Sequence, residues 1–170
     1  MEALEEKQIE ADISQALPTG GPFGDYGEID NVFDEGKSHL QHKAGEVLLV
    51  DVWATWCGPC QRPMQHNQEM LEKNEAVWGD KVRIVAVSVD EEKEVIATRV
   101  NSRKWTKIQH LTLLGWKGDH HLIKNFSITG IPFVCLVDKF GKIAFTGHPS
   151  SIKLEDKINE LLQQESEIIA

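Results

Sequence analysis

Two cysteines separated by two residues form the pair in this sequence whose types and spacing suit chemistry. Cys57 and Cys60 make a C-x-x-C motif around Gly58 and Pro59, and Cys135 is the third cysteine. Two intervening residues allow the sulfur atoms to reach bonding distance. One thiolate of such a pair can attack a disulfide of another molecule, and the second thiol can then release it. The motif therefore predicts thiol–disulfide exchange.

The pair lies between a predicted strand and a predicted helix. Residues 47–53 are apolar and rich in β-branched side chains, which is typical of a strand buried on both faces. Residues 60–77 have a helical composition, and Pro63 places the helix start close to the cysteines. Unpaired N–H groups and the dipole at that start favour a thiolate. We expect Cys57 to be the exposed nucleophile and Cys60 to lie beneath it.

The rest of the chain predicts alternating strands and helices without internal repeats. A second apolar strand is expected at 82–89, parallel to the first, followed by a charged helix at 90–103. The later expectations are a strand near 110–114, a turn at 115–118, a helix at 119–126, a hairpin of strands 131–137 and 142–146 around a turn at 138–141, and a closing helix at 152–162. Core candidates on the helix after the cysteines are Met64, Met70, Leu71 and Val77.

The first 42 residues carry weaker signals. Residues 1–17 suit either a solvated tail or a weakly amphipathic helix, and 18–27 read as a loop because they hold four glycines and two prolines. Residues 29–42 suit a short helix that ends before Gly45.

The string VDVWATWCGPC at 50–60 resembles the active-site segment of the thioredoxin superfamily. A second string, TGIP at 129–132, resembles the loop in which that family carries a cis-proline facing the disulfide. The resemblance implies an α/β, three-layer thioredoxin-like fold with a central mixed sheet flanked by helices. It covers roughly 31–162, and we expect the domain at 29–164, between an acidic extension and loop at 1–28 and a tail at 165–170.

The stretch from Asp90 to Pro132 is longer than in a minimal thioredoxin. It leaves room for an inserted strand and helix before the cis-proline loop. The enlarged form is similar to the nucleoredoxin, tryparedoxin and bacterial membrane-anchored thioredoxin-like branch.

The resemblance also implies roles for individual residues. Cys57 and Cys60 would be catalytic, and buried Asp51 would help to deprotonate Cys60, since burial raises a carboxyl pKa. The alternative for Asp51 is a hydrogen-bonded strand residue. Ile131 would pair with an extended substrate strand through its backbone, and Pro132 would cover the sulfur atoms. The other residues expected to bind substrate are Trp56, Gly58, Pro59, Gly130 and Gly147.

One departure concerns the handling of protons. Thioredoxins place a lysine near the buried aspartate, whereas this sequence offers Ala86 on the neighbouring strand. Among other residues, Cys135 is expected in the core, and the basic cluster at 99–107 on a solvated helix face. His148 follows Gly147 near the expected docking groove, where a part in proton transfer is a minor alternative.

The motif and the resemblance together predict a protein-disulfide reductase with no cofactor beyond its own dithiol. Gly-Pro between the cysteines resembles the reducing members of the superfamily. Expected partners are disulfide-containing proteins and, as electron donor, a thioredoxin reductase or glutathione. The main alternative is a redox-dependent binding regulator of nucleoredoxin type. A zinc site is a weaker alternative, because no second C-x-x-C or spaced His pair offers further ligands. A peroxiredoxin is also weaker, because the Pro and Thr arrangement of that family is absent.

Composition excludes several other classes of function. The 170 residues carry 18 Lys and Arg against 27 Asp and Glu, a net charge of -9. A nucleic-acid backbone or an anionic membrane surface would be repelled on average. The acidic N-terminus lacks the pattern of a secretory signal, and no apolar run reaches the length of a spanning helix. We expect a cytoplasmic monomer.

Overall fold

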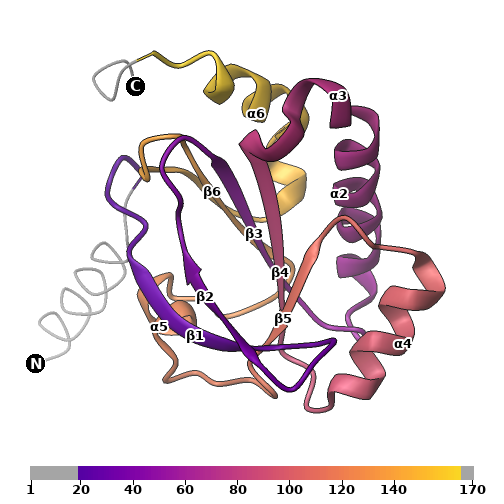
Figure 1. Cartoon of the computed structure of the whole chain (residues 1–170). Helices are drawn as coiled ribbons and strands as arrows, with labels where there is room; N and C mark the ends of the chain where they lie inside the picture. Colours follow the sequence, from indigo (N-terminus) through magenta and orange to yellow (C-terminus); the bar gives the residue numbers. More distant parts are fainter. Residues whose placement is uncertain (1–18, 166–170) are drawn as a thin grey trace, which may run out of the picture.

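The computed structural model describes residues 19–165 and contains one mixed seven-stranded sheet. Its strand order is β2-β1-β5-β4-β3-β6-β7 (Figure 1). The strands are β1 (Asp25–Asn31), β2 (Lys37–Gln41), β3 (Val47–Trp53), β4 (Val82–Ser88), β5 (Gln109–Thr112), β6 (Phe133–Val137) and β7 (Ile143–Gly147). The α-helices are α2 (Gln61–Lys73), α3 (Glu75–Trp78), α4 (Lys93–Arg103), α5 (His121–Asn125) and α6 (Leu154–Leu162). The predicted mixed sheet flanked by helices is confirmed.

The centre of the sheet is formed by the two apolar strands that the sequence predicted. All seven residues of β3 are buried, and β4 pairs with β3 in parallel along its whole length. A strand covered on both faces needs apolar side chains at successive positions, which explains the continuous apolar runs. Since β5 is also parallel to β4, the carboxyl ends of β3, β4 and β5 meet at one edge of the sheet.

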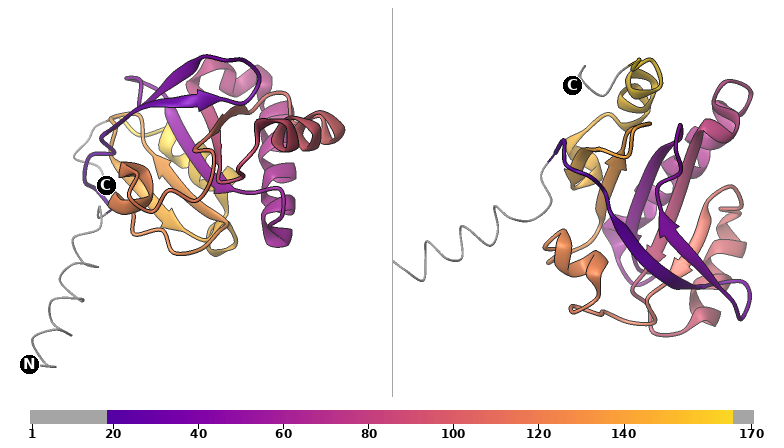
Figure 2. Two further views of the ribbon diagram at one scale, coloured as in Figure 1. Left: turned by 90° about the horizontal axis from the view of Figure 1, so that it is seen from below. Right: turned by 60° about the vertical axis from the view of Figure 1, so that its left-hand side comes forward.

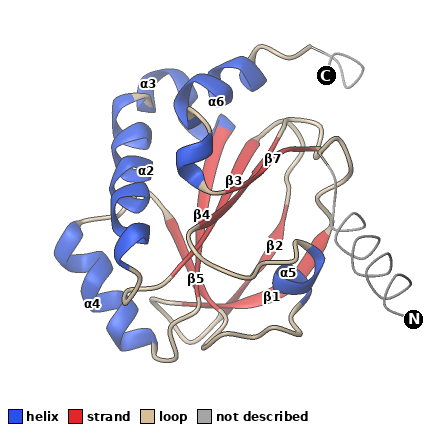
Figure 3. Cartoon of the chain, turned by 180° about the vertical axis from the view of Figure 1, so that it is seen from behind, coloured by secondary structure: helices blue, strands red, loops and turns tan. Residues whose placement is uncertain are grey.

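Helices cover both faces of the sheet. Seen from behind, α2, α3 and α6 lie next to one another over one face (Figure 3). Two hydrogen bonds join them, from Asn74 Nδ2 to Glu155 Oε2 at 3.0 Å and from Trp78 Nε1 to Asn159 Oδ1 at 2.8 Å. Helix α5 lies apart from this group, across the sheet from α2 and α4 (Figure 2). Phe126, just after α5, stacks with Phe23 and Tyr26 near β1.

The single helix predicted at 60–77 is divided in two. Asn74 ends α2 with a non-helical backbone, and its side chain donates to the Met70 carbonyl oxygen at 2.9 Å. The chain then turns into α3. This turn buries Trp78 and leaves Val77 72% exposed, so the prediction of Val77 as a core residue was wrong. Met64 and Met70 are buried as expected.

The helix predicted at 29–42 was wrong, because the segment forms strands. β1 and β2 pair as an antiparallel hairpin, and β1 begins at Asp25, within the predicted loop. The buried side chains of this hairpin are Tyr26, Ile29 and Leu40, whereas Phe33 is 53% exposed. A register shift between Asp25 and Glu28 breaks the two-residue alternation that would have indicated a strand.

The expected insertion before the cis-proline loop is present as β5 and α5. β5 connects the central strands to the hairpin, since it pairs with β4 on one side and with β1 on the other. Beyond the insertion, β6 and β7 form the predicted antiparallel hairpin around 138–141. Its turn is closed by Asp138 Oδ1, which accepts from the N–H groups of Phe140 at 2.9 Å and Lys142 at 3.0 Å.

The described residues leave out most of both chain ends. The alternatives for residues 1–17 lie outside the described residues, as does most of the tail expected at 165–170. Within 19–165, every helix is too short or too polar to cross a lipid bilayer.

Candidate active site

The two cysteines of the C-x-x-C motif form a disulfide just beyond β3. Their Cα atoms lie 5.3 Å apart, and Cys57 caps the short 3-10 helix Gly58–Cys60 that continues into α2. Cys60 has no exposed surface, as predicted, whereas Cys57 keeps 6% of its own. The expectation of an exposed Cys57 was therefore wrong, because the residue is buried. The Cys57 Sγ lies 3.9 Å from the carbonyl oxygen of Ile131.

The loop before Cys57 is held by the buried carboxylate of Asp90, which follows β4. Thr55 donates to it twice, from its N–H to Oδ2 at 2.9 Å and from its hydroxyl to Oδ1 at 2.6 Å. The Ser88 hydroxyl also donates to Oδ2, at 2.6 Å. Because both oxygens of Asp90 accept bonds from the fold, this carboxylate fixes the loop position.

Gln61, the residue after Cys60, braces the same loop from the helix. Its Nε2 donates to the carbonyl oxygens of Cys57 at 2.8 Å and of Ala54 and Thr55 at 3.3 Å each. Arg99 on α4 completes the brace, since its Nη1 donates to Gln61 Oε1 at 2.5 Å and to the Thr55 carbonyl at 3.2 Å. No carboxylate among the described residues forms an ion pair with Arg99. A full positive charge is thus held two hydrogen bonds away from the Cys57 backbone.

The loop before β6 brings the second sequence match to the disulfide. The peptide bond between Ile131 and Pro132 is cis, Pro132 is buried and Ile131 is half-buried. The 3.9 Å approach of the Ile131 carbonyl to Cys57 Sγ joins the strings at 50–60 and 129–132, which lie far apart in the sequence.

A third component of the site is Asp51, a fully buried carboxyl within β3. Its neighbours across the sheet are Ala86 on β4 and Val134 on β6, so the expected replacement of lysine by Ala86 is confirmed. Asn67 on α2 donates from Nδ2 to Asp51 Oδ2 at 2.8 Å. Burial raises the pKa of Asp51 to about 7, and the bond from Asn67 counteracts part of that rise. Asp51 can therefore exchange a proton near neutral pH.

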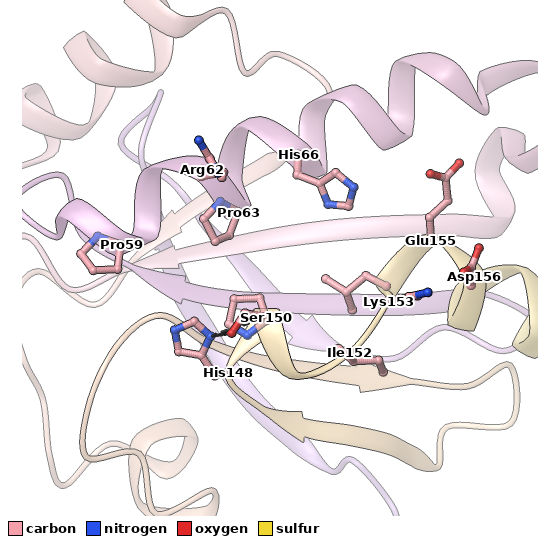
Figure 4. A pocket seen from close by; sticks show the side chains of 12 residues that line it. Pro59, Arg62, Pro63, His66, His148, Ser150, Ile152, Lys153, Glu155 and Asp156 are labelled. Carbon is pink, nitrogen blue, oxygen red and sulfur yellow. Dashed lines mark hydrogen bonds between the residues drawn. The ribbon is translucent and has the colours of Figure 1, made fainter.

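A groove of about 610 Å³ begins beside the disulfide and runs between α2 and the start of α6 (Figure 4). One wall carries Pro59, Pro63 and His66, and the other carries His148, Pro149 and Ile152. Figure 4 shows the rings of Pro63 and His66 directed from α2 toward the opposite wall. Arg62 and Ser150 also line the groove, and its far end reaches Glu155 and Asp156 at the start of α6 (Figure 4).

The residues predicted to bind substrate occupy different parts of this surface. Trp56 is 69% exposed, and Gly58, Pro59 and Gly130 are exposed as well. Gly147 ends β7 opposite Val134 and precedes His148 of the groove. The structure therefore places Pro59 at the groove and Ile131 at the sulfur atom, with the indole of Trp56 open to solvent.

This geometry matches a known protein family. The family model described as thioredoxin-like matches residues 45–143, which is more than half of the chain and includes β3 to β6. The chain belongs to the thioredoxin-like family. It holds a disulfide between Cys57 and Cys60 within the matched residues, and it is a thioredoxin-like redox enzyme.

Individual thioredoxin-like relatives agree with this assignment. The thiol-disulfide oxidoreductase ResA of Bacillus thuringiensis is 25% identical over 130 residues, covering 75% of this chain and 70% of the relative. Thioredoxin of Bacillus subtilis is 44% identical over 48 residues, covering 28% and 42%. The solved thioredoxin domain of a thiol-disulfide oxidoreductase from Bacteroides vulgatus is 20% identical, covers 86% of this chain and 99% of that domain, and superposes with a TM-score of 0.69.

Sequence reasoning missed four residues of this thioredoxin-like site. They are Gln61, Asn67, Asp90 and Arg99. Asn67 lies two helical turns after Cys60, so the helical repeat could have placed it on the buried face. Asp90 directly follows a buried strand, where polar residues meet at the sheet edge. The prediction of Arg99 on a solvated face was wrong, because its guanidinium reaches back to the active-site loop.

The described residues offer no alternative metal centre. Between residues 19 and 165, no three His, Cys, Asp or Glu side chains are grouped closely enough to hold a metal ion. Cys135, the remaining cysteine, is buried in β6, as expected for a core residue.

Proposed function

We propose that this chain is a thiol-disulfide oxidoreductase that works mainly as a reductase of protein disulfides. The observation that carries the proposal is the asymmetry of the cysteine pair. Cys57 retains some exposure next to the exposed Trp56, whereas Cys60 is wholly buried behind it. One sulfur can therefore meet a substrate while the other waits inside.

The first step is attack by the Cys57 thiolate on one sulfur of a substrate disulfide. The substrate S–S bond breaks, its second sulfur leaves as a thiolate, and a mixed disulfide forms between Cys57 and the substrate. The start of the helix and the positive charge of Arg99 both favour the attacking anion. The backbone of Ile131, whose carbonyl oxygen lies 3.9 Å from Cys57 Sγ, pairs with an extended substrate segment in this scheme, as the family resemblance implies.

The second step releases the substrate. Cys60 transfers its thiol proton to Asp51, and the resulting thiolate attacks the Cys57 sulfur. The bond between Cys57 and Cys60 forms, the mixed disulfide breaks, and the substrate departs as a second thiolate. Two electrons have passed from the dithiol to the substrate. A thioredoxin reductase or glutathione is the class of donor that would return the pair to the dithiol.

The two residues between the cysteines favour disulfide reduction over oxidation. Gly58 and Pro59 resemble the reducing members of the superfamily. Thioredoxin has a potential of about -270 mV, and the oxidant DsbA about -120 mV. Equilibration of this chain with glutathione buffers is expected to give a value near the first figure, and a value near the second would contradict a reductase.

Cysteine variants test the two steps separately. Cys57→Ser is expected to abolish reduction of insulin disulfides, whereas Cys60→Ser should accumulate a mixed disulfide that non-reducing electrophoresis detects. Cys135→Ala is the matched control and should retain activity, because Cys135 is buried in the core. Normal turnover by Cys60→Ser would refute the two-thiol scheme.

A further variant separates the enzyme from a redox-dependent binding regulator. When both active-site cysteines are serine, a regulator would still complement the loss of the wild-type chain in cells and hold its partner. An enzyme would lose that cellular role, which is the outcome we expect.

A further inference from the structure

The buried acid of the site is paired with an amide that the sequence pattern did not indicate. Asp51 is 1% exposed, and Asn67 has no exposed surface. The hydrogen bond from Asn67 Nδ2 to Asp51 Oδ2, at 2.8 Å, is the polar contact that the described residues give this carboxyl. An amide of α2 therefore contacts the carboxyl, while Ala86 stands at the strand position where the resemblance places a lysine.

The two groups face each other across the sheet and helix interface. Cys60, Met64 and Asn67 are buried at helical spacing, so they share the face of the helical segment that packs on the sheet. Asp51 lies in the strand beneath that face. Cys60 and Asn67 are consequently two turns apart on the side of the helix that meets Asp51.

The bond distinguishes the two oxygens of Asp51. Oδ2 accepts from Asn67, whereas Oδ1 is buried and has no partner among the described side chains and backbone groups. A buried polar atom without a partner destabilises the fold. A proton on Oδ1 would turn that atom into a donor, so Oδ1 is the oxygen suited to take up a proton. The Oδ1 of Asn67 is likewise buried and unpartnered, which keeps an acceptor close to the carboxyl.

No charge from the neighbouring elements competes with this amide. Ala86 on β4 and Val134 on β6 flank Asp51, and the buried residues of α6 are apolar. Cys135 on β6 is a buried free thiol, and Cys60 is buried in the disulfide. The charged side chain of β4, Arg83, is half-buried and paired with Glu46 at 2.8 Å. The charged side chains of α2 and α6 lie exposed or half-buried at their outer faces, namely Arg62, His66, Glu69, Glu72, Lys73, Glu155, Asp156, Lys157 and Glu160.

We propose that Asn67 is a positioning residue for the reaction, which holds Asp51 by Oδ2 and leaves Oδ1 to receive the thiol proton of Cys60. In that transfer the S–H bond of Cys60 breaks and an O–H bond forms on Asp51, while Nδ2 of Asn67 stays bound to the second oxygen. Because an N–H donor stabilises the carboxylate, loss of Asn67 leaves Asp51 protonated to higher pH. This inference rests on the proposed function only for the identity of the proton donor.

The test is the pair of variants Asn67→Leu and Gln68→Leu. Both replace a buried amide of α2 by an apolar side chain of similar size, and Gln68 contacts Glu72 and Lys107 instead of Asp51. The carboxyl carbon of Asp51, followed by ¹³C NMR against pH in the oxidised protein, should titrate at least one pH unit higher in Asn67→Leu than in the wild type. Gln68→Leu should leave the titration unchanged.

A kinetic measurement then connects the pair with catalysis. The mixed disulfide of Asn67→Leu should be resolved about tenfold more slowly than that of the wild type at pH 7, with the difference shrinking above pH 9. Gln68→Leu should show a wild-type pH profile. Should Asn67→Leu fold poorly, Asn67→Ser, which keeps a short hydroxyl donor, should give a smaller shift in the same direction.

The outcomes separate this inference from the proposed function. An unchanged Asp51 titration in Asn67→Leu, or an equal shift in Gln68→Leu, would overturn the role of Asn67 even if the enzyme reduces disulfides. A shifted titration together with an unchanged rate of resolution would also overturn it. Failure of the cysteine variants to behave as expected would instead remove the proposed function and leave the paired titration standing.

Discussion

The three cysteines carry the same side chain but differ in burial and in the element that holds them. Cys57 keeps 6% of its surface, while Cys60 and Cys135 keep none. Cys60 is nevertheless one bond from Cys57, whereas Cys135 is enclosed in β6 beside Val50 of β3. Burial raises the pKa of the Cys135 thiol far above its usual range. Cys57 stands at the start of a helix, which favours its thiolate, whereas Cys135 lies within a strand and has no such stabilisation.

This contrast gives a prediction at the scale of single residues. Iodoacetamide should leave the oxidised, folded protein unlabelled, because the one free thiol is buried and protonated. After reduction Cys57 should be labelled first, and Cys135 only after denaturation. Peptide mass spectrometry locates each label. Alkylation of Cys135 in the folded protein would show that β6 opens readily.

Residue types and spacing could predict the cysteine pair, and the resemblance of contiguous strings to a known family could predict Asp51 and the cis-proline loop. Asn67 and Arg99 could not be found in that way. Their partners lie 16 and 38 positions away in the sequence, at Asp51 and Gln61, and the contacts exist only once α2 and α4 are packed. Side chains that act on a site from another element leave no local motif.

At the scale of elements, the sequence predicted the buried central strands correctly and the hairpin at the edge of the sheet wrongly. β3 and β4 were predicted because strands covered on both faces are apolar throughout. The β1 and β2 hairpin lies at the sheet edge, where a register shift and an exposed Phe33 disturb the alternation. The break between α2 and α3 depends on Asn74, whose side chain bonds to Met70 and to Glu155 of α6. That second contact is tertiary and could not be read from α2 alone.

A prediction at this scale concerns the brace between α4 and the active-site loop. Arg99→Met removes the charge and both hydrogen bonds to Gln61 and Thr55. We expect the reduced enzyme to be alkylated at Cys57 several-fold more slowly at pH 7, because a nearby positive charge favours the thiolate. The difference should shrink in 1 M salt, which screens the charge.

The matched control for this brace is on the same helix. Arg103 is exposed, and its side chain takes no part in the hydrogen bonds or ion pairs found within residues 19–165, so Arg103→Met should react like the wild type. Equal alkylation rates for the two variants would show that Arg99 acts on the fold without acting on Cys57. Stopped-flow or quenched mass spectrometry at several pH values provides the rates.

At the scale of the whole molecule, the buried carboxyl of the site acts against stability. Asp51 lies at the centre of the sheet, in the strand with the most extensive pairing. Its side chain has one hydrogen bond and apolar strand neighbours. An uncharged side chain of the same shape would fit this position without the cost of desolvating a carboxylate. A residue retained for proton transfer is thus expected to lower the free energy of unfolding wherever it is ionised.

The sign of the pH dependence follows from the raised pKa of Asp51. Burial raises that pKa to about 7 in the folded protein, while the unfolded chain releases the same proton at about pH 4. Between these values the folded state holds a proton that the unfolded state has lost, so stability falls as the pH rises. The decline is about 1.4 kcal/mol per pH unit and about 4 kcal/mol in total, an order-of-magnitude figure.

Comparison with Asp51→Asn isolates this contribution, because the other titrating groups are common to both proteins. Asparagine keeps an oxygen that can accept from Asn67 Nδ2 and carries no charge. The advantage of the variant in the free energy of unfolding should be small at pH 4, grow through pH 5 and 6, and level off above pH 7. Urea unfolding of the two oxidised proteins at each pH gives this difference. An advantage that did not change with pH would mean that Asp51 stays ionised in the fold, and with it the argument for Asp51 as proton acceptor would be lost.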